Sequence, residues 1–365
     1  MKFQKIKLPF KIKRPVLALG PQTKNRVCFA RGNFAYLGPL HPDLTHPRDF
    51  FAFERSVKYF LKKKPGIIAY DLHPEYQSTK YALNLKPNAY QFIPIQHHHA
   101  HIASCMLENG LTRQKVIGVA FDGTGLGNDH RLWGAEFLVC DYKDFKRTAH
   151  LKEIPLLGAE RAILEPIRIV FAWFFNLGPD LLKKIGLKEQ RVLRQMYLSG
   201  FNSPLASSMG RLFDAAGSLV LARSKVTREG ELALALERIA ASYKGEALSY
   251  QFKITKDKEG YILDPLLVLK GIIQDLKAGE PKGKIAYRFH LTVARMIQKM
   301  CLILGKENKI NKVVLSGGVF QNNLLLRLTL DLLYKEVFRV FTHEKVSPND
   351  SGISLGQVAV ANFKG

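Results

Sequence analysis

Residues 116–140, VIGVAFDGTGLGNDHRLWGAEFLVC, predict an apolar strand, a glycine-rich turn and a returning strand. We expect the turn over DGTGLG (122–127), whose glycines let backbone N–H groups approach phosphate oxygens. Asp122 stands at the end of the strand, where a carboxylate is well placed to bind a metal. An ordinary tight turn explains the same residues, so this segment alone leaves both interpretations open.

A similar unit occurs near the N-terminus. PVLALG (15–20) predicts a strand, PQTKN (21–25) a turn and RVCFARG (26–32) a returning strand. Two such units, each followed by helices and strands, predict a two-lobed α/β protein that binds its ligand between the lobes.

The rest of the chain supplies the expected helices and strands. Residues 50–64 and 287–305 have helical spacing, IIAYDL (67–72) predicts a buried strand, and Asn109-Gly110 predicts a helix end. We expect the first lobe over 1–110, with the C-terminal helix at 350–365 returning to it, and the second lobe over 111–349, with a mainly helical insertion around 150–250.

The composition of the 365 residues limits the class of protein. No run of about 18 apolar residues is present, and no apolar signal-peptide core follows the basic N-terminus, so we expect a cytoplasmic protein without a membrane span. The four cysteines lie far apart and form no C-x-x-C pair, which favours buried thiols over disulfides or a zinc ribbon.

The formal net charge of +24 is compatible with nucleic-acid binding or with a solvated lysine-rich surface that attracts acidic partners. The charge is spread along the chain, and no basic module with interleaved aromatic residues is present. We therefore favour the second interpretation and expect no nucleic-acid partner.

Four histidines gather in QHHHAHI (96–102). On a helix, His97 and His101 project from one face, whereas His98 aligns with the apolar Ile102. Two imidazoles at positions i and i+4 commonly hold zinc or iron, although a chance pair of core or surface histidines gives the same spacing.

Two further segments have mixed interpretations. LSGG (315–318) ends a predicted strand and leads to Asn322 at the start of a helix, which suits a nucleotide. Asp350 lies where a helix N-cap would be expected, and Asp214 would equally fit a solvated helix residue. No P-loop, G-x-S-x-G or H-E-x-x-H motif is present.

Seven segments taken together resemble the C-terminal carbamoyltransferase domain of the hydrogenase maturation protein HypF, over about residues 15–360. They are AYDLHPEYQSTKYA, QHHHAHIAS, DGTGLG…WGAEF, EPIR, SSMGRLFDAAG, LSGGVFQNNLL and PNDSGISLGQ. That domain is similar to Kae1-type proteins and belongs to the actin-like, sugar-kinase-like superfamily, which implies a nucleotide cleft between two lobes.

The resemblance also implies site residues. A divalent iron or zinc ion would be held by His97, His101, Asp122 and Asp350, while His98 and His99 pack or support the ligands. The adenine nucleotide, as carbamoyl-adenylate, AMP or ATP with Mg²⁺, would meet Gly123, Gly125, Gly317, Gly318 and Asn322, with Asp214 near the ribose. We expect catalytic roles for Asp122 and for Lys24, whose ammonium would stabilise charge at the phosphate or carbamoyl group.

In HypF, carbamoyl phosphate and ATP form carbamoyl-adenylate, and this domain passes the carbamoyl group to the C-terminal cysteine of HypE. The resemblance therefore implies a HypE-directed carbamoyltransferase. HypF also carries an acylphosphatase-like domain, C-x-x-C zinc motifs and a YrdC-like adenylate-forming domain, none of which these 365 residues match. We expect either a fragment or a separate YrdC-like protein as the source of adenylate.

This sequence departs from the family pattern at three places. GPQTKN (20–25) replaces the usual G-x-E-L-K-N, Ala135 replaces a common glycine, and Asn128-Asp129-His130 alters a common turn. Three other functions stay open: a small-molecule O-carbamoyltransferase, a Kae1-like enzyme of tRNA threonylcarbamoyl transfer, and a noncatalytic nucleotide-binding scaffold. DGTGLG stands where Kae1 proteins carry a V-S-G-G-H-T-like motif, which argues against the tRNA function.

Overall fold

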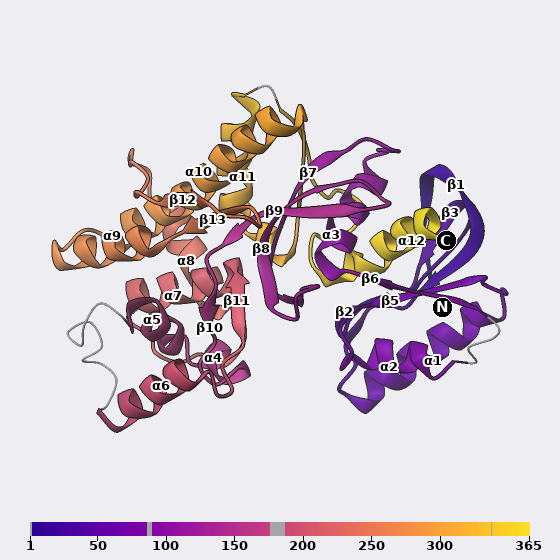
Figure 1. Cartoon of the computed structure of the whole chain (residues 1–365), viewed down its shortest axis with the longest axis horizontal. Coiled ribbons are helices and arrows are strands. Elements are labelled where there is room, and N and C mark those ends of the chain that lie inside the picture. The colour runs from indigo at the N-terminus through magenta and orange to yellow at the C-terminus, as the bar shows by residue number, and fades with distance from the viewer. Residues whose placement is uncertain (1, 86–89, 176–186, 337) are drawn as a thin grey trace.

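The computed structural model describes residues 2–85, 90–175, 187–336 and 338–365 and has two lobes of mixed α/β structure (Figure 1). The elements of the first part of the chain are β1 (Gln4–Ala18), β2 (Thr23–Asn25), β3 (Cys28–Leu37), β4 (His41–Asp43), α1 (Pro47–Leu61), β5 (Ile67–Asp71), α2 (Gln77–Leu83), β6 (Gln91–Ile95) and α3 (His97–Glu108). The central elements are β7 (Val116–Leu126), β8 (Leu132–Cys140), β9 (Phe145–Leu151), β10 (Ile154–Pro155), α4 (Glu160–Leu164), α5 (Ile167–Phe174), α6 (Leu187–Ser199), β11 (Leu205–Ser208), α7 (Met209–Leu221) and α8 (Glu231–Ser242). The last are β12 (Lys253–Lys256), β13 (Tyr261–Asp264), α9 (Leu266–Lys277), α10 (Lys282–Asn308), β14 (Lys312–Ser316), η4 (Gly318–Gln321), α11 (Asn323–Tyr334), β15 (Arg339–Phe341), η5 (Asp350–Gly352) and α12 (Ile353–Lys364).

The sheet of the first lobe has the strand order β3-β1-β5-β6. β1 is antiparallel to β3 and parallel to β5, which is parallel to β6. The predicted pairing of the first unit is confirmed, but its strand begins at Gln4 rather than at Pro15. The basic N-terminal stretch extends the strand because Ile6 and Leu8 are buried while Lys5 and Lys7 between and beside them stay exposed, the alternation of a strand with one solvated face.

Both faces of this sheet are covered. Val16 and Ala18 face one hydrophobic cluster, which includes residues of α12, whereas Leu17 faces another, which includes Phe53 and Val57 of α1. Successive side chains of a strand point to opposite faces, so PVLALG is apolar throughout because helices cover both sides. Both chain termini lie in this lobe (Figure 1), since α12 packs against β1, β3 and β5. The lobe boundaries expected from the sequence stay a prediction.

The main path of the second sheet is β12-β13-β9-β8-β7-β14-β15. β14 is parallel to β7 and β15, while β7 and β8 are antiparallel. The turn predicted over 122–127 is wrong. β7 continues through these glycines to Leu126 after a register shift, because Gly125 still pairs with Trp133, and the chain reverses at 127–131.

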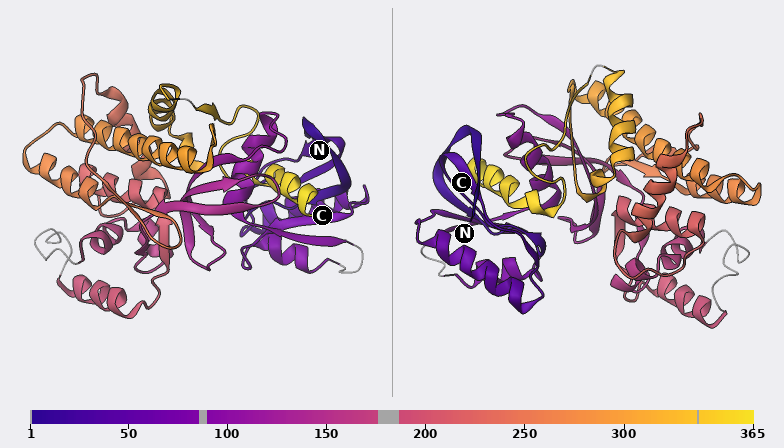
Figure 2. Two further views of the ribbon diagram at one scale, coloured as in Figure 1. Left: turned by 45° about the horizontal axis from the view of Figure 1, so that its top comes forward. Right: turned by 180° about the vertical axis from the view of Figure 1, so that it is seen from behind.

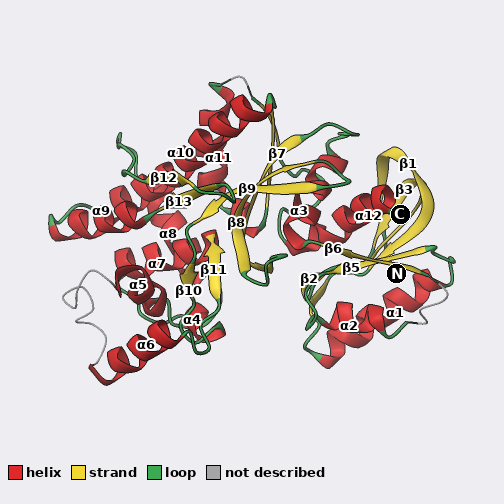
Figure 3. Ribbon diagram, in the orientation of Figure 1, coloured by secondary structure: helices red, strands yellow, loops and turns green. Residues whose placement is uncertain are grey.

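Helices occupy most of the expected insertion and both flanks of the second sheet (Figures 2 and 3). The predicted long helix is α10, and the last predicted strand is β15. All four cysteines are buried and free, as predicted. Within the described ranges, no helix combines the length and the apolar character needed to cross a bilayer.

α3 lies where the two lobes meet. It contacts β1 and α12 on one side and β7, β8 and β14 on the other. In Figure 1 it stands between the two sheets. The predicted helix end is confirmed, because α3 stops at Glu108 and Gly110 adopts a left-handed φ of +74°. The first turn of α3 is thus held at the junction of the lobes.

Candidate metal centre

Four side chains that are distant in sequence converge at the start of α3. Nε2 of His101 lies 3.2 Å from Oδ2 of Asp122 and 3.7 Å from Oδ1 of Asp350. Nε2 of His97 lies 3.5 Å and 3.8 Å from the same two oxygens. One nitrogen or oxygen atom from each residue lies within 4.8 Å of those from the other three. The structure thus brings together all four residues of the implied ligand set.

The carboxyl ends of parallel strands create this convergence. β5 and β6 run side by side with Asp71 opposite Ile95, and the chain then enters α3 at His97. In the second sheet, β14 and β7 are parallel with Ser316 opposite Ala120, two residues before Asp122. Open α/β sheets bind ligands at this end of their strands.

The chemistry of the cluster fits a divalent metal ion. Nε2 of His97 is buried and has no hydrogen-bond partner among the described residues. A buried nitrogen without a hydrogen-bond partner lowers the stability of the fold unless a metal or another ligand binds it. Two imidazoles and two carboxylates form a donor set suited to zinc or iron, so the cluster does not by itself distinguish between them.

The charges within the cluster support the same assignment. Burial alone would lower the pKa of His97, but the carboxylates of Asp71, Asp122 and Asp350 outweigh it and raise that pKa well above its usual value. The pKa of His101 is also raised against its burial, mainly by Asp122 and Asp350. Protons on these imidazoles therefore occupy the place of a cation and must leave when a metal binds.

One supporting residue is absent from the sequence-based prediction. Oδ2 of Asp71 lies 2.8 Å from Nδ1 of His97, and both side chains are buried. A carboxylate behind a metal-binding histidine fixes its tautomer and its orientation. Asp71 follows an apolar run at the end of β5, and Asp122 likewise follows the apolar run VIGVAF within β7; this shared position is the signal that could have identified Asp71.

The other two histidines of the segment lie outside the cluster, as expected. Nδ1 of His98 lies 3.2 Å from the side-chain Nε2 of Gln96, and Nε2 of His99 lies 2.6 Å from the backbone carbonyl oxygen of Asp141. Burial lowers the pKa of His98 well below its usual value and that of His99 to about 4. Both rings are therefore neutral packing groups at pH 7.

The expected nucleotide-binding glycines have different surroundings. The N–H of Gly318 donates to Oδ1 of Asp122 at 3.1 Å, which places LSGG beside the cluster. A Cβ on Gly125 would lie 2.9 Å from Cδ2 of His97, so this glycine makes room for the imidazole rings. A Cβ on Gly123 would meet only the end of the Glu229 side chain at less than 3 Å.

Two other candidates have structural contacts. Oδ1 of Asn322 accepts from the N–H of Leu325 at 2.8 Å as the N-cap of α11, and Nδ2 of Asn322 lies 2.9 Å from His290. Lys24 is exposed on β2 with φ of +47°, next to Thr23, whose hydroxyl lies 3.4 Å from Asp350. Lys24 is therefore adjacent in sequence to a residue that reaches the cluster, but it makes no described contact with the cluster itself.

Asp214 is a buried residue of α7, and its alternative interpretation as a solvated helix residue is wrong. Its Oδ2 lies 2.9 Å from Nε of the buried Arg211, which also reaches Glu229 at 2.8 Å. Burial raises the pKa of Asp214 to about 6 against the effect of Arg211.

This raised pKa predicts a pH-dependent stability. The folded protein holds a proton on Asp214 that the unfolded chain, with an ordinary pKa of 3.8, releases, so the stabilisation is complete below that pH and is lost as the pH rises through about 6. Between pH 5 and pH 7, the wild type should lose about 1 kcal/mol more unfolding free energy than Asp214→Asn. Urea unfolding at both pH values measures this difference, and an equal loss in both proteins would contradict the shift.

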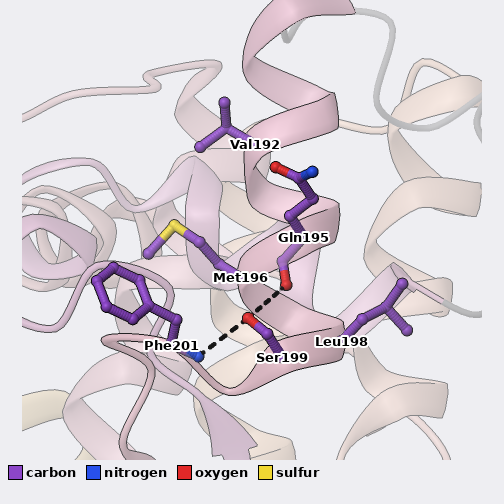
Figure 4. Close-up of a pocket in the computed structure, with 6 residues that line it drawn as sticks. All are labelled: Val192, Gln195, Met196, Leu198, Ser199 and Phe201. Carbon is purple, nitrogen blue, oxygen red and sulfur yellow. Dashed lines mark hydrogen bonds between the residues drawn. The ribbon is translucent and has the colours of Figure 1, made fainter.

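An apolar hollow on the surface is separate from the candidate centre. Figure 4 shows it beside α6, which lies toward the far end of the second lobe in Figure 1. Its lining residues are Val192, Gln195, Met196, Leu198, Ser199 and Phe201. Ser199 Oγ donates to the carbonyl of Gln195 and accepts from the N–H of Phe201, and no lining residue is titratable. The hollow offers no catalytic chemistry.

Comparisons with known proteins identify the family of this chain. The family described as HypF Kae1-like domain matches residues 11–108, and the family described as carbamoyltransferase, Kae1-like domain, second subdomain, matches residues 118–357. Carbamoyltransferase HypF2 of Cupriavidus necator is 33% identical over 95% of this chain, which covers 46% of that protein. A carbamoyltransferase HypF homolog of the same organism is also 33% identical, over 95% of this chain and 91% of that protein.

Solved structures give the same result. A full-length HypF in its phosphate- and nucleotide-bound form has a TM-score of 0.93 and 39% identity, covering 98% of this chain and 57% of that one. HypF of T. kodakarensis has a TM-score of 0.87 and 28% identity, covering 98% and 48%. The chain thus spans about half the length of several HypF proteins that it matches. Together, the matched families and the relatives establish that this chain belongs to the HypF family of Kae1-like carbamoyltransferase domains.

Proposed function

We propose that this chain transfers a carbamoyl group from carbamoyl-adenylate to the thiolate of the C-terminal cysteine of HypE. The observation that carries the proposal is the cluster of His97, His101, Asp122 and Asp350 beside Gly318, in a chain of the HypF Kae1-like family. A YrdC-like protein or domain would supply the adenylate. The proposed cofactors are one divalent iron or zinc ion and an adenine nucleotide.

The reaction breaks the bond between the carbamoyl carbon and the phosphate oxygen of AMP, while the HypE sulfur forms a new bond to that carbon. His97, His101, Asp122 and Asp350 would hold the metal, which when bound would act as a Lewis acid toward a carbamoyl or phosphate oxygen. The chain itself must orient the adenylate and exclude water.

Individual residues have proposed parts in this task. Asp122 would help to hold the metal, and its Oδ1 accepts the N–H of Gly318, which ties the metal site to the LSGG segment. Asp214 accepts from a ribose hydroxyl. The ammonium of exposed Lys24 stabilises negative charge on the phosphate or the carbamoyl oxygen.

Mass spectrometry of HypE tests the acceptor. After incubation with this chain and carbamoyl-adenylate, HypE should gain about 43 Da, the replacement of a thiol hydrogen by CONH2 in a covalent transfer. HypE with its C-terminal cysteine changed to alanine should gain nothing. An unmodified HypE with a carbamoylated hydroxyl compound would favour the O-carbamoyltransferase, and threonylcarbamoylated tRNA would favour the Kae1-like function.

The chain alone should not turn over carbamoyl phosphate and ATP. We expect this because the two matched families, over 11–108 and 118–357, account for the Kae1-like fold and leave no YrdC-like segment among these residues. Pyrophosphate release measures adenylate formation, with an added YrdC-like protein as the positive control. Adenylate formation by the chain alone would refute the need for a separate activity.

A further inference from the structure

We propose that a buried hydrogen-bond chain from Glu108 through His343 and Ser316 determines which ring nitrogen of His101 faces the metal site. The inference rests on the proposed metal role of His101. The three residues are positioning residues, because none of them belongs to the cluster of four candidate ligands.

The contacts run in one line behind the metal site. Nδ1 of His101 lies 3.4 Å from Oγ of Ser316, and the same oxygen lies 2.8 Å from Nε2 of His343. Nδ1 of His343 is in direct contact with Oε1 of Glu108. Neither of these two atoms has another hydrogen-bond partner among the described residues, so we expect them to hydrogen-bond to each other.

Glu108 is itself held firmly. Its Oε2 accepts the backbone N–H of Lys345 at 2.6 Å and of Val346 at 3.1 Å. Glu108 and His101 both lie on α3, about two turns apart on the same face. Loop residues after β15 and the end of β14 close the path between them.

The carboxylate imposes a direction on every proton in the chain. A carboxylate only accepts, so His343 must carry its proton on Nδ1. Burial lowers the pKa of His343, which leaves the ring neutral with a lone pair on Nε2. The hydroxyl of Ser316 donates to that lone pair and, with its own oxygen, accepts the Nδ1–H of His101. Nε2 of His101 is then the nitrogen that faces Asp122 and Asp350, and it is the one that binds a metal once its proton has left.

His97 obtains the same tautomer in a different way. Its Nδ1 is held by Asp71 at the end of β5, in the first lobe. Its partner His101 is instead held from β14 and from the loop after β15, in the second lobe. Separate polar groups thus orient the two imidazoles, so metal affinity depends on the residues behind both rings.

A second metal site at Glu108 is a weaker explanation of the same residues. Sγ of Cys105 lies close enough to Glu108 and His343 to form a group of three candidate ligands. Burial raises the pKa of the Cys105 thiol well above its usual value, which opposes the thiolate that a metal needs. Oε2 of Glu108 already accepts hydrogen bonds from two backbone amides.

Glu108→Gln tests the donor-to-acceptor direction of this hydrogen-bond chain. The glutamine oxygen must face the two amides of Lys345 and Val346, so its NH2 group faces Nδ1 of His343 and forces the proton to Nε2. Nε2 of His343 then donates to the hydroxyl of Ser316 instead of accepting from it. His101 keeps its metal-binding tautomer only if the buried Ser316 hydroxyl loses its partner, which is costly.

The first measurement is made on the metal-free protein. Long-range ¹⁵N–¹H NMR should show His343 with its proton on Nδ1 in the wild type and on Nε2 in Glu108→Gln. The second is a Zn²⁺ titration in competition with a chelator, where the affinity of Glu108→Gln should be lower by about 10- to 100-fold. Both results are independent of carbamoyl transfer, so they stand or fall separately from the proposed reaction.

Ser316→Ala is the matched test, because it cuts the chain without disturbing Glu108. The double variant Ser316→Ala/Glu108→Gln should bind Zn²⁺ as Ser316→Ala does, since a broken chain no longer transmits the change. Losses that add would assign Glu108 a merely structural role and overturn the proposal. An unchanged His343 tautomer in Glu108→Gln would also overturn it. If Glu108→Gln does not fold, Ser316→Ala decides alone. An unchanged Zn²⁺ affinity would overturn the proposed hydrogen-bond chain, and a lower affinity would support it.

Discussion

His101→Ala should lose its bound metal and about a thousandfold of its transfer rate to HypE, because Lewis-acid stabilisation at such sites contributes several kcal/mol. The change removes the imidazole whose Nε2 lies nearest to both Asp122 and Asp350. Among the described residues, it also leaves His97 as the one imidazole near those two carboxylates. Elemental analysis of the purified variant measures the metal, and HypE mass spectrometry measures the transfer.

The fold of this variant should survive. The core contacts of α3 come mainly from apolar residues such as Ile102 and Met106, which stay in place. Exposed His46 provides the control, since His46→Ala removes an imidazole far from α3 in the chain and should leave metal and activity unchanged. A His101→Ala protein with normal metal content and normal transfer would refute the ligand assignment.

Gly317→Ala should lower the free energy of unfolding by at least about 3 kcal/mol. Gly317 has φ of +101°, a conformation that side-chain-bearing residues rarely adopt. A Cβ at this position would lie 2.1 Å from the carbonyl oxygen of Phe121 in the neighbouring strand β7. Neither atom can move without opening the pairing of β14 and β7, which positions Asp122 and Ser316.

Gly110→Ala is the matched control for this change. Gly110 has φ of +74°, but no atom lies within 4 Å of a Cβ built there. Its replacement should therefore cost only the backbone strain, about 1 kcal/mol. Urea unfolding of both variants separates the two contributions. Equal losses would show that the contact with Phe121 is relieved by a small movement of the strands.

The sequence allowed much of the candidate centre to be predicted. His97 and His101 are i and i+4 on a helix, and Asp122 directly follows the apolar run VIGVAF, so local sequence indicates all three. Asp350 came from the resemblance to HypF. The error over 122–127 has a local cause. Glycines usually indicate a turn, but Gly125 belongs to an extended strand that needs a small residue next to the rings of His97 and His98.

The supporting residues could not be predicted in the same way. Glu108 is on the helix face of His101, but nothing in its neighbourhood along the chain indicates that His343 faces it. Ser316 lies 215 positions from His101 along the chain, and His343 lies 242 positions from it. They meet because β14 and β15 are neighbours in one sheet.

Periodicity and turn residues in the sequence by themselves determined the helices, most strands and the two-lobed α/β class, because these depend on side chains a few positions apart. Only the tertiary structure decided which carboxylate, hydroxyl or imidazole stands behind each histidine of the centre. Those contacts depend on the order of strands in two sheets and on the return of the C-terminal segment to α3, and strand order arises from packing over the whole chain.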